Sequence, residues 1–240
     1  CFEKCRKIQT IQSQLESLSN PEKKAYFPTF FKTGKGQYGE GDLFIGIIVP
    51  DIRKVAKANK DITPEEIELL LNNSFHECRM CALMILVEQF KKRKKENERK
   101  SIFDFYLSHT SRINNWDLVD LSAKDIVGEY LADKQDRTVL YKLAESSLLW
   151  DQRIAVIATF AFIKRHDFTD IINLSEKLLY HKHDLMHKAI GWMLRETGKK
   201  NKSVLIGFLD KHHQSMPRTM LRYSIEKLSA EEKSYYMRKI

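Results

Sequence analysis

Small residues return along this chain at a spacing that suits one helical hairpin per repeat. Each one lies within a segment whose apolar residues recur with a period near 3.6: Cys81, Ser122, Ala155, Ala189 and Ser224. The successive separations are 41, 33, 34 and 35 residues (122 − 81, 155 − 122, 189 − 155 and 224 − 189). Helical solenoids have repeats of this length, and small residues at matching positions let neighbouring helices approach closely. We therefore expect an all-α, HEAT-like helical-repeat solenoid.

The 240 residues are enough for one large repeat domain and do not require two domains. We predict a single domain over residues 1–240, with about 1–75 as an irregular N-terminal cap and first repeat, and 76–240 as regular repeats. The segment ITPEEIELLL predicts a helix that begins after Thr63 as N-cap, with Pro64 in its first turn. Strand signals are scarce, and only DLFIGIIVP, residues 42–50, combines β-branched and aromatic residues over a short run.

A second register accompanies the small residues. Two positions before each of them stands a polar or ionisable residue: Arg79, Asp120, Arg153, His187 and Arg222. Equivalent positions of successive repeats line the same surface of a solenoid, and four of these five side chains can be cationic. The net charge of +9 and the pI of about 9.2 also favour a polyanionic partner. The pattern indicates a concave basic groove that follows a nucleic-acid backbone, although a solvated helix face remains an alternative.

No apolar run reaches the roughly 20 residues that a membrane-spanning helix needs. We therefore expect a soluble intracellular protein, cytoplasmic and nucleoid-associated in a bacterium. The four cysteines are Cys1, Cys5, Cys78 and Cys81, and an intracellular chain of this length does not favour a disulfide framework. Two cysteine pairs also raise a zinc site, but CRMC at 78–81 lies in an apolar helical segment, where cysteine packs as a small buried side chain.

Two short motifs resemble known sites without their structural context. GKGQYG, residues 34–39, matches the spelling of a dinucleotide fingerprint, but neither a clear strand before it nor a helix after it is expected. We interpret it as a glycine-rich connector on which Lys35 is a candidate phosphate contact. HDLMH, residues 183–187, has the i, i+4 histidine spacing of zinc sites but no evident third ligand. We expect neither a metal nor a cofactor.

The segment NNWDLVD, residues 114–120, places a carboxylate in an apolar helix. Trp116 and Asp120 are four residues apart, so they are neighbours on one face of a helix. A carboxylate in such a stripe is unfavourable unless it is paired or faces a wet groove. Asp117 is a candidate capping residue, whereas Asp120 fits a structural ion pair and a catalytic carboxylate equally well.

Three ordered segments at repeat spacing carry a resemblance to a known family: NNWDLVD (114–120), LLWDQRIAVIATF (148–160) and KAIGWMLRETGKKN (188–201). Residues 30–57 and 217–228 support it, so that it runs from about Tyr26 to about Leu228. The chain resembles the AlkD-like DNA alkylation repair enzymes, which are HEAT-repeat DNA glycosylases. The resemblance implies excision of cationic N3- and N7-alkylated purines from duplex DNA by a monomer, without a cofactor and without a base-flipping pocket.

The resemblance also implies roles for individual residues. The catalytic carboxylate falls on Asp120, the two indoles on Trp116 and Trp192, and the active-site arginine on Arg153. A phosphate-contacting arginine falls on Arg53. Further DNA contacts are expected from the repeat register, the glycine-rich connector and the matching C-terminal segments: Arg79, His187, Arg222, Lys35, Arg195, Lys199, Lys200 and Arg218. Two alternatives keep the solenoid but lack turnover: a module that binds the shape of DNA or RNA, and a scaffold for a partner helix.

Overall fold

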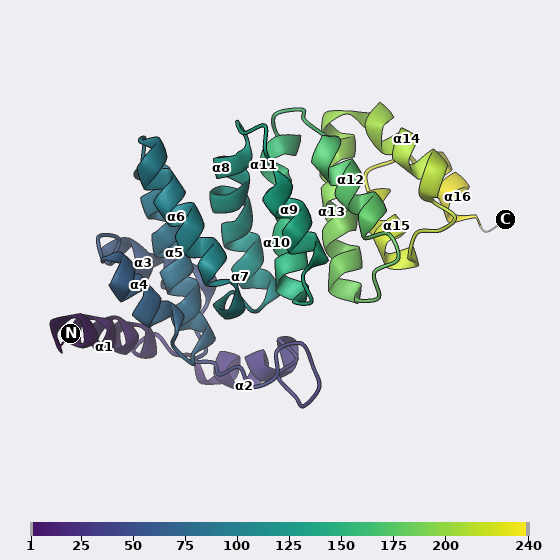
Figure 1. Ribbon diagram of the computed structural model, residues 1–240. Coiled ribbons are helices and arrows are strands. Elements are labelled where there is room, and N and C mark those ends of the chain that lie inside the picture. Colours follow the sequence, from purple (N-terminus) through teal and green to yellow (C-terminus); the bar gives the residue numbers. More distant parts are fainter. Residues whose placement is uncertain (1, 239–240) are drawn as a thin grey trace. The chain divides into compact units, whose positions relative to one another are not determined.

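The computed structural model describes residues 2–238, which fold into helices joined by turns (Figure 1). No β-strand occurs within that range, and one isolated bridge joins Leu43 to Phe75. The expectation of an all-α fold is therefore confirmed. The chain divides into two compact units, residues 1–122 and 123–240, and each is described by itself below. None of the described helices is both long and apolar enough to cross a membrane.

The first unit contains the N-terminal helices and the helix that carries the NNWDLVD segment. Its elements are α1 (Phe2–Glu16), α2 (Pro21–Phe30), α3 (Val49–Ala58), α4 (Pro64–Leu71), α5 (His76–Lys92), α6 (Glu96–Ser108), the 3-10 turn η1 (Thr110–Arg112) and α7 (Trp116–Ala123). Helix α5 is the centre of this unit, since its residues are almost all buried and α3 and α4 both pack against it.

Helix α4 begins where the sequence predicts. The Thr63 hydroxyl accepts a hydrogen bond from the Glu66 backbone N–H at 3.3 Å. The Glu66 carboxylate in turn accepts one from the Thr63 backbone N–H at 2.8 Å. This reciprocal capping box satisfies two N–H groups that have no partner inside the helix, and Pro64 occupies the first helical position.

The apolar run at 42–50 is not a strand. Residues 44–48 form no regular secondary structure, Leu43 makes only the isolated bridge to Phe75, and α3 begins at Val49. Position 46 requires glycine, because its φ is +91° and a Cβ would lie 2.5 Å from the Lys24 backbone nitrogen. The run is apolar because Phe44, Ile45 and Ile47 enter the core of the unit.

The second unit consists of helices that pack as pairs, such as α9 with α10 and α12 with α13. Its elements are the π-helix η2 (Lys124–Gly128), α8 (Glu129–Leu131), α9 (Thr138–Glu145), α10 (Leu149–Ala158), α11 (Phe160–Ile163), α12 (Thr169–Lys177), α13 (Asp184–Lys200), α14 (Lys202–His212), α15 (Arg218–Ser224) and α16 (Ala230–Met237). Pairs of adjacent helices are the expected product of a hairpin repeat.

The small residues of the repeat register all face the interior. They lie on α5, α7, α10, α13 and α15, and each is at most 1% exposed: Cys81, Ser122, Ala155, Ala189 and Ser224. Close helix approach is clearest between α13 and α15, where a Cβ on Gly191 would lie 2.7 Å from the Met220 carbonyl oxygen. The recurring small residues are therefore buried, as the repeat pattern predicts, and the close approach of α13 to α15 lies at Gly191, two residues after Ala189.

Candidate functional site

Helix α7 presents Trp116 and Asp120 on one face. Its first turn is held by side chains, because the Asn115 side-chain oxygen accepts a hydrogen bond from the Trp116 N–H at 2.8 Å and the Asp117 carboxylate accepts one from the Leu118 N–H at 2.8 Å. The spacing of four residues makes the indole and the Asp120 carboxylate neighbours on the helix. Both are half-buried, so they retain access to solvent while Leu118 and Val119 fill the core.

Trp116 packs against aromatic rings from the segment that ends α2. Its ring stacks on that of Phe31, with centroids 5.5 Å apart and planes 23° from parallel, and meets Phe30 edge-on at 6.0 Å. Trp116 also lines an apolar cavity of about 330 Å³ together with residues of α2, α3 and α5. The indole therefore has a defined orientation and forms part of the wall of this cavity.

A buried network of charged groups lies directly beside Trp116. The two ring nitrogens of His76 contact Asp42 at 2.9 Å and Asp117 at 2.7 Å. Arg79 pairs with the other oxygen of Asp42 and donates to the carbonyl oxygens of Asn73 and Ser74, both at 3.1 Å. The network joins the segment just after the glycine-rich connector, the start of α5 and the start of α7.

The contacts of the network keep His76 and Asp42 charged at neutral pH. Burial alone lowers the pKa of His76, but the charges and hydrogen bonds of Asp117 and Asp42 outweigh it and raise that pKa to about 9. Burial raises the pKa of Asp42, yet His76 and Arg79 together hold it below its usual value of 3.8.

Stability is expected to fall on the alkaline side because of His76. Its folded pKa of about 9 exceeds the ordinary value of 6.5, so the stabilisation is complete below about pH 6.5 and is lost as the pH rises to about 9. The loss amounts to roughly 3 kcal/mol, at 1.36 kcal/mol per pKa unit. Urea unfolding followed by circular dichroism between pH 6.5 and 9 measures it. A free energy of unfolding that stays flat over this range in wild type would contradict the assignment, and His76→Gln serves as the control that lacks the slope.

Glu77, the residue after His76 in α5, binds the backbone of residues 45–47. Its carboxylate accepts hydrogen bonds from the backbone N–H groups of Ile45, Gly46 and Ile47, at 2.9, 2.8 and 3.3 Å. The extended segment lacks a partner strand to satisfy these donors, and a buried N–H without a partner is costly. Together, His76 and Glu77 anchor the connector and the segment after it to the first turn of α5.

The other two proposed active-site residues lie in the second unit, on helices that pack against each other. Arg153 on α10 is buried, and its guanidinium donates a hydrogen bond to the Leu185 carbonyl oxygen on α13 at 2.5 Å. Trp192 lies seven residues after Leu185, two turns along the same side of α13, and is half-buried near Phe160. Arg153 and Trp192 thus belong to one packed pair of helices, as Trp116 and Asp120 belong to α7.

Most of the predicted DNA-contacting side chains reach the surface of their own unit. Five are exposed: Lys35, Arg53, Lys199, Lys200 and Arg222. Three are half-buried and hold internal partners, since His187 contacts the His181 carbonyl oxygen, Arg195 pairs with Glu226, and Arg218 donates to the Met237 carbonyl oxygen. The exposed five are the simplest candidates for phosphate contacts.

Arg79 does not belong on a basic surface, which corrects its place in the repeat register. Its side chain is 1% exposed, and its guanidinium is committed to Asp42 and to two backbone carbonyls. The register places Arg79 among the residues of one solenoid surface but does not reveal the Asp42 carboxylate that draws it inward. We remove Arg79 from the proposed DNA contacts.

The histidines and cysteines have structural contacts. His183 is the N-cap of α13, where its Nδ1 accepts from the Leu185 N–H at 3.1 Å. Cys78 and Cys81 are buried free thiols whose pKa values burial raises, that of Cys81 to about 12. Cys1 lies outside the described residues. Within residues 2–238, no group of three or more His, Cys, Asp or Glu side chains is arranged to hold a metal ion.

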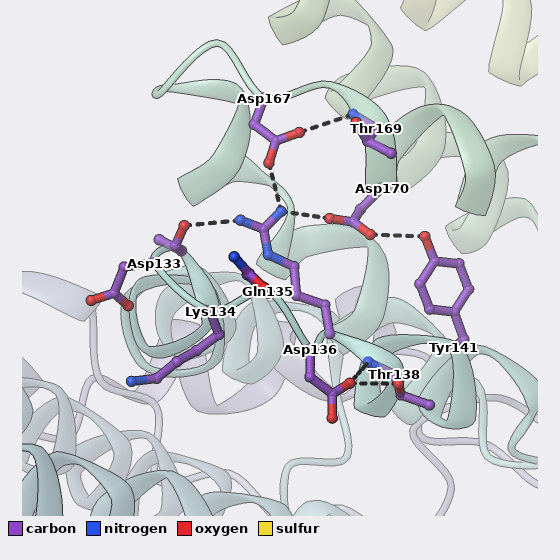
Figure 2. A pocket seen from close by; sticks show the side chains of 11 residues that line it. Asp133, Lys134, Gln135, Asp136, Thr138, Tyr141, Asp167, Thr169 and Asp170 are labelled. Atoms are coloured by element: carbon purple, nitrogen blue, oxygen red, sulfur yellow. Dashed lines mark hydrogen bonds and ion pairs between the residues drawn. The ribbon is translucent and has the colours of Figure 1, made fainter.

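A second cavity, of about 700 Å³, lies in the second unit around Arg137 (Figure 2). The guanidinium pairs with Asp167 and Asp170, both at 2.7 Å, and lies 3.9 Å from the ring centroid of Phe162. It also donates to two backbone carbonyls, so its donors are used within the protein. The remaining acidic side chains of this cavity make it unfavourable for DNA.

Sequence reasoning misses the network around His76. Its members are 34 and 41 residues from His76 in sequence, and no short motif joins them. The only local indication in the sequence is the pair His76–Glu77, two polar residues at the start of a largely apolar helical segment. Such a pair is unusual because polar groups inside a core require partners.

Comparisons with known proteins agree with this architecture. The family model of the DNA alkylation repair enzymes matches residues 11–228. A solved structure described as a predicted DNA alkylation repair enzyme from Enterococcus faecalis superimposes with a TM-score of 0.68 at 17% identity, and the match covers 88% of this chain and 97% of that one. No curated protein matches the chain. The structural likeness shows the shared fold, and the family match, which spans most of the sequence, shows that the chain belongs to the DNA alkylation repair enzyme family.

Proposed function

We propose that the protein is a DNA glycosylase that excises cationic N3- and N7-alkylated purines from duplex DNA. The observation that carries the proposal is the pairing of Trp116 with Asp120 on one face of α7, with the indole held in place by Phe31. An acid beside an aromatic ring suits a cationic sugar, whereas a groove that only binds phosphates gains nothing from a carboxylate at its centre.

The reaction uses the instability of the lesion itself. Alkylation at a ring nitrogen makes the purine cationic, so the C1′–N bond breaks with its electron pair going to the departing neutral base. Positive charge then grows on the deoxyribose, where the ionised Asp120 stabilises it and orients a water molecule. That water forms the new bond to C1′ and releases a proton, which completes the hydrolysis.

The remaining residues hold the substrate. Trp116 and Trp192 pack against the sugar and backbone of the lesion nucleotide, and the faces of their rings favour its positive charge. Arg153 binds the adjoining phosphate through its guanidinium. Because these residues engage the backbone, the enzyme needs no pocket that encloses a flipped base.

Release of free base decides between this function and the alternatives. Duplex DNA methylated with dimethyl sulfate or methyl methanesulfonate is incubated with the protein, and liberated 7-methylguanine and 3-methyladenine are quantified by chromatography. The glycosylase proposal expects free base and abasic sites. Tight DNA binding with no released base above the spontaneous rate would instead indicate a non-catalytic nucleic-acid-binding protein.

A further inference from the structure

The imidazole of His76 is the more enclosed of the two histidine rings in the first unit. Both nitrogens contact carboxylates, Asp42 at 2.9 Å and Asp117 at 2.7 Å. Two aromatic side chains pack against the ring, with the centroids of Phe31 and Phe44 4.9 and 4.8 Å from that of the imidazole. Its side chain is 2% exposed, so the ring cannot turn without breaking several contacts at once.

The contact with Asp117 reaches the first turn of α7. One oxygen of that carboxylate contacts the His76 ring, while the other accepts the Leu118 N–H at 2.8 Å. Asp117 therefore ties the N-terminus of α7 to the start of α5. Asp120 lies three residues further along this eight-residue helix, so a shift of the first turn displaces the Asp120 carboxylate as well.

A second chain of contacts runs from His76 to the indole. The Phe31 ring lies between the two, 4.9 Å from the imidazole and 5.5 Å from the Trp116 ring, on which it stacks. The backbone neighbour of Trp116 is Asp117, so the ring and the main chain of Trp116 are both positioned through His76. Both residues that the proposed reaction uses on α7 thus depend on one buried side chain.

We propose that His76 is a positioning residue for base excision: clamped between Asp42 and Asp117, it fixes the first turn of α7 and thereby places Trp116 and Asp120 against the lesion. The inference rests on the proposed glycosylase function and extends it to a residue that touches neither the DNA nor the reacting atoms. It also explains the glycine-rich connector, which delivers Asp42 to the ring.

A purely stabilising role does not require these groups. Removing ions from water costs several kcal/mol each, and well-packed apolar side chains of similar volume often serve a core as well or better. Charged hydrogen bonds contribute direction, which apolar contacts lack. Three other charged groups belong to the surroundings of the network. Arg79 pairs with Asp42, and Glu77 binds three backbone N–H groups. Arg112 donates to backbone carbonyl oxygens, and burial and the charge of Arg79 lower its pKa.

The test compares chemistry with binding at matched stability. The His76→Gln side chain remains polar but cannot carry a charge or bridge two carboxylates. We expect the single-turnover rate of 7-methylguanine release to fall about 10- to 100-fold, because small displacements of catalytic groups cost this much. The Kd for duplex DNA should change less than about threefold, because the phosphate contacts lie elsewhere.

Leu15→Ala provides the matched control. Leu15 is fully buried in α1 of the same unit and lies outside the segments of the network, and its truncation costs about 2–5 kcal/mol of stability. At a temperature where both variants are folded, Leu15→Ala should retain the wild-type rate. If the rate of His76→Gln equals that of Leu15→Ala, the positioning role is refuted.

A double-mutant cycle tests whether His76 acts through Asp117. Asp117→Asn should lower the rate like His76→Gln, and the double variant should be no slower than the slower single variant, since both break one contact. If the rate losses of the two single variants multiply in the double variant, the proposal is overturned. Amide hydrogen exchange over residues 115–122 adds a readout that needs no activity: it should quicken in His76→Gln and stay unchanged in Leu15→Ala, and equal protection in wild type and His76→Gln would also refute the role.

These outcomes separate the two proposals. If Asp120→Asn abolishes base release while His76→Gln releases base at the wild-type rate, the glycosylase function stands and the positioning role fails. If wild type releases no base, the glycosylase function fails, and hydrogen exchange alone decides whether His76 fixes the first turn of α7.

Discussion

Asp120→Asn is expected to lower the rate of 7-methylguanine release by about 100- to 1,000-fold, the loss typical of removing one group that stabilises transition-state charge. The substitution preserves the shape of the side chain and removes its negative charge. Positive charge that develops on the deoxyribose then has no carboxylate to stabilise it. Single-turnover kinetics on methylated duplex DNA measure the effect directly, without the contribution of product release.

The affinity for DNA should not fall together with the rate of base release. Because Asp120→Asn removes a negative charge from a surface proposed to face phosphates, the affinity for DNA should be equal to or slightly greater than that of wild type. Asp104→Asn makes the same change of charge on the exposed side of α6, outside the surface proposed to bind DNA. This variant should release base at the wild-type rate. Excision at the wild-type rate by Asp120→Asn would remove the catalytic assignment.

The affinity for undamaged duplex DNA is expected to fall about 1,000-fold between 50 and 200 mM salt, if roughly six phosphates are neutralised. Each neutralised phosphate releases condensed counterions, so the logarithm of the binding constant falls linearly with the logarithm of salt concentration. The exposed cations Arg53, Lys199, Lys200 and Arg222 are the principal candidates for these contacts. Fluorescence anisotropy with a labelled duplex across this salt range gives the slope.

Individual contacts can be counted from the same slope. Lys200→Gln should make the slope shallower by about one and weaken binding to all sequences alike, as expected for a phosphate contact. Lys177→Gln removes the same charge from α12, where the lysine pairs with Glu145, and should leave the slope unchanged. Binding that is insensitive to salt would rule out a basic groove as the DNA site.

Local patterns in the sequence predict much of the fold correctly. The helical period and the recurring small residues anticipate an all-α chain and identify buried positions such as Ala155 and Ala189. Thr63 and Pro64 mark the start of α4, because a cap and its partner lie within four residues of each other. The one apparent strand, residues 42–50, fails because an apolar extended run needs a partner strand, and this one is bound by Glu77 instead.

The residues proposed for catalysis are equally visible in the sequence, since Trp116 and Asp120 are one helical turn apart and the family resemblance names their partners Arg153 and Trp192. The surroundings of these residues are not visible there. Arg79 illustrates the difference, because its register predicts a surface cation whereas Asp42 draws it into the core.

The sequence by itself determined the helical class and the burial of the recurring small residues, because both depend on spacing within a few turns. The four central residues remain a prediction from the family resemblance. Only the tertiary structure decided which charges are buried together. His76 meets Asp42 and Asp117 across 34 and 41 residues of chain, and such pairs form only when the packing of α5, α7 and the connector excludes water around them. That packing turns a glycine-rich connector into part of the support for α7.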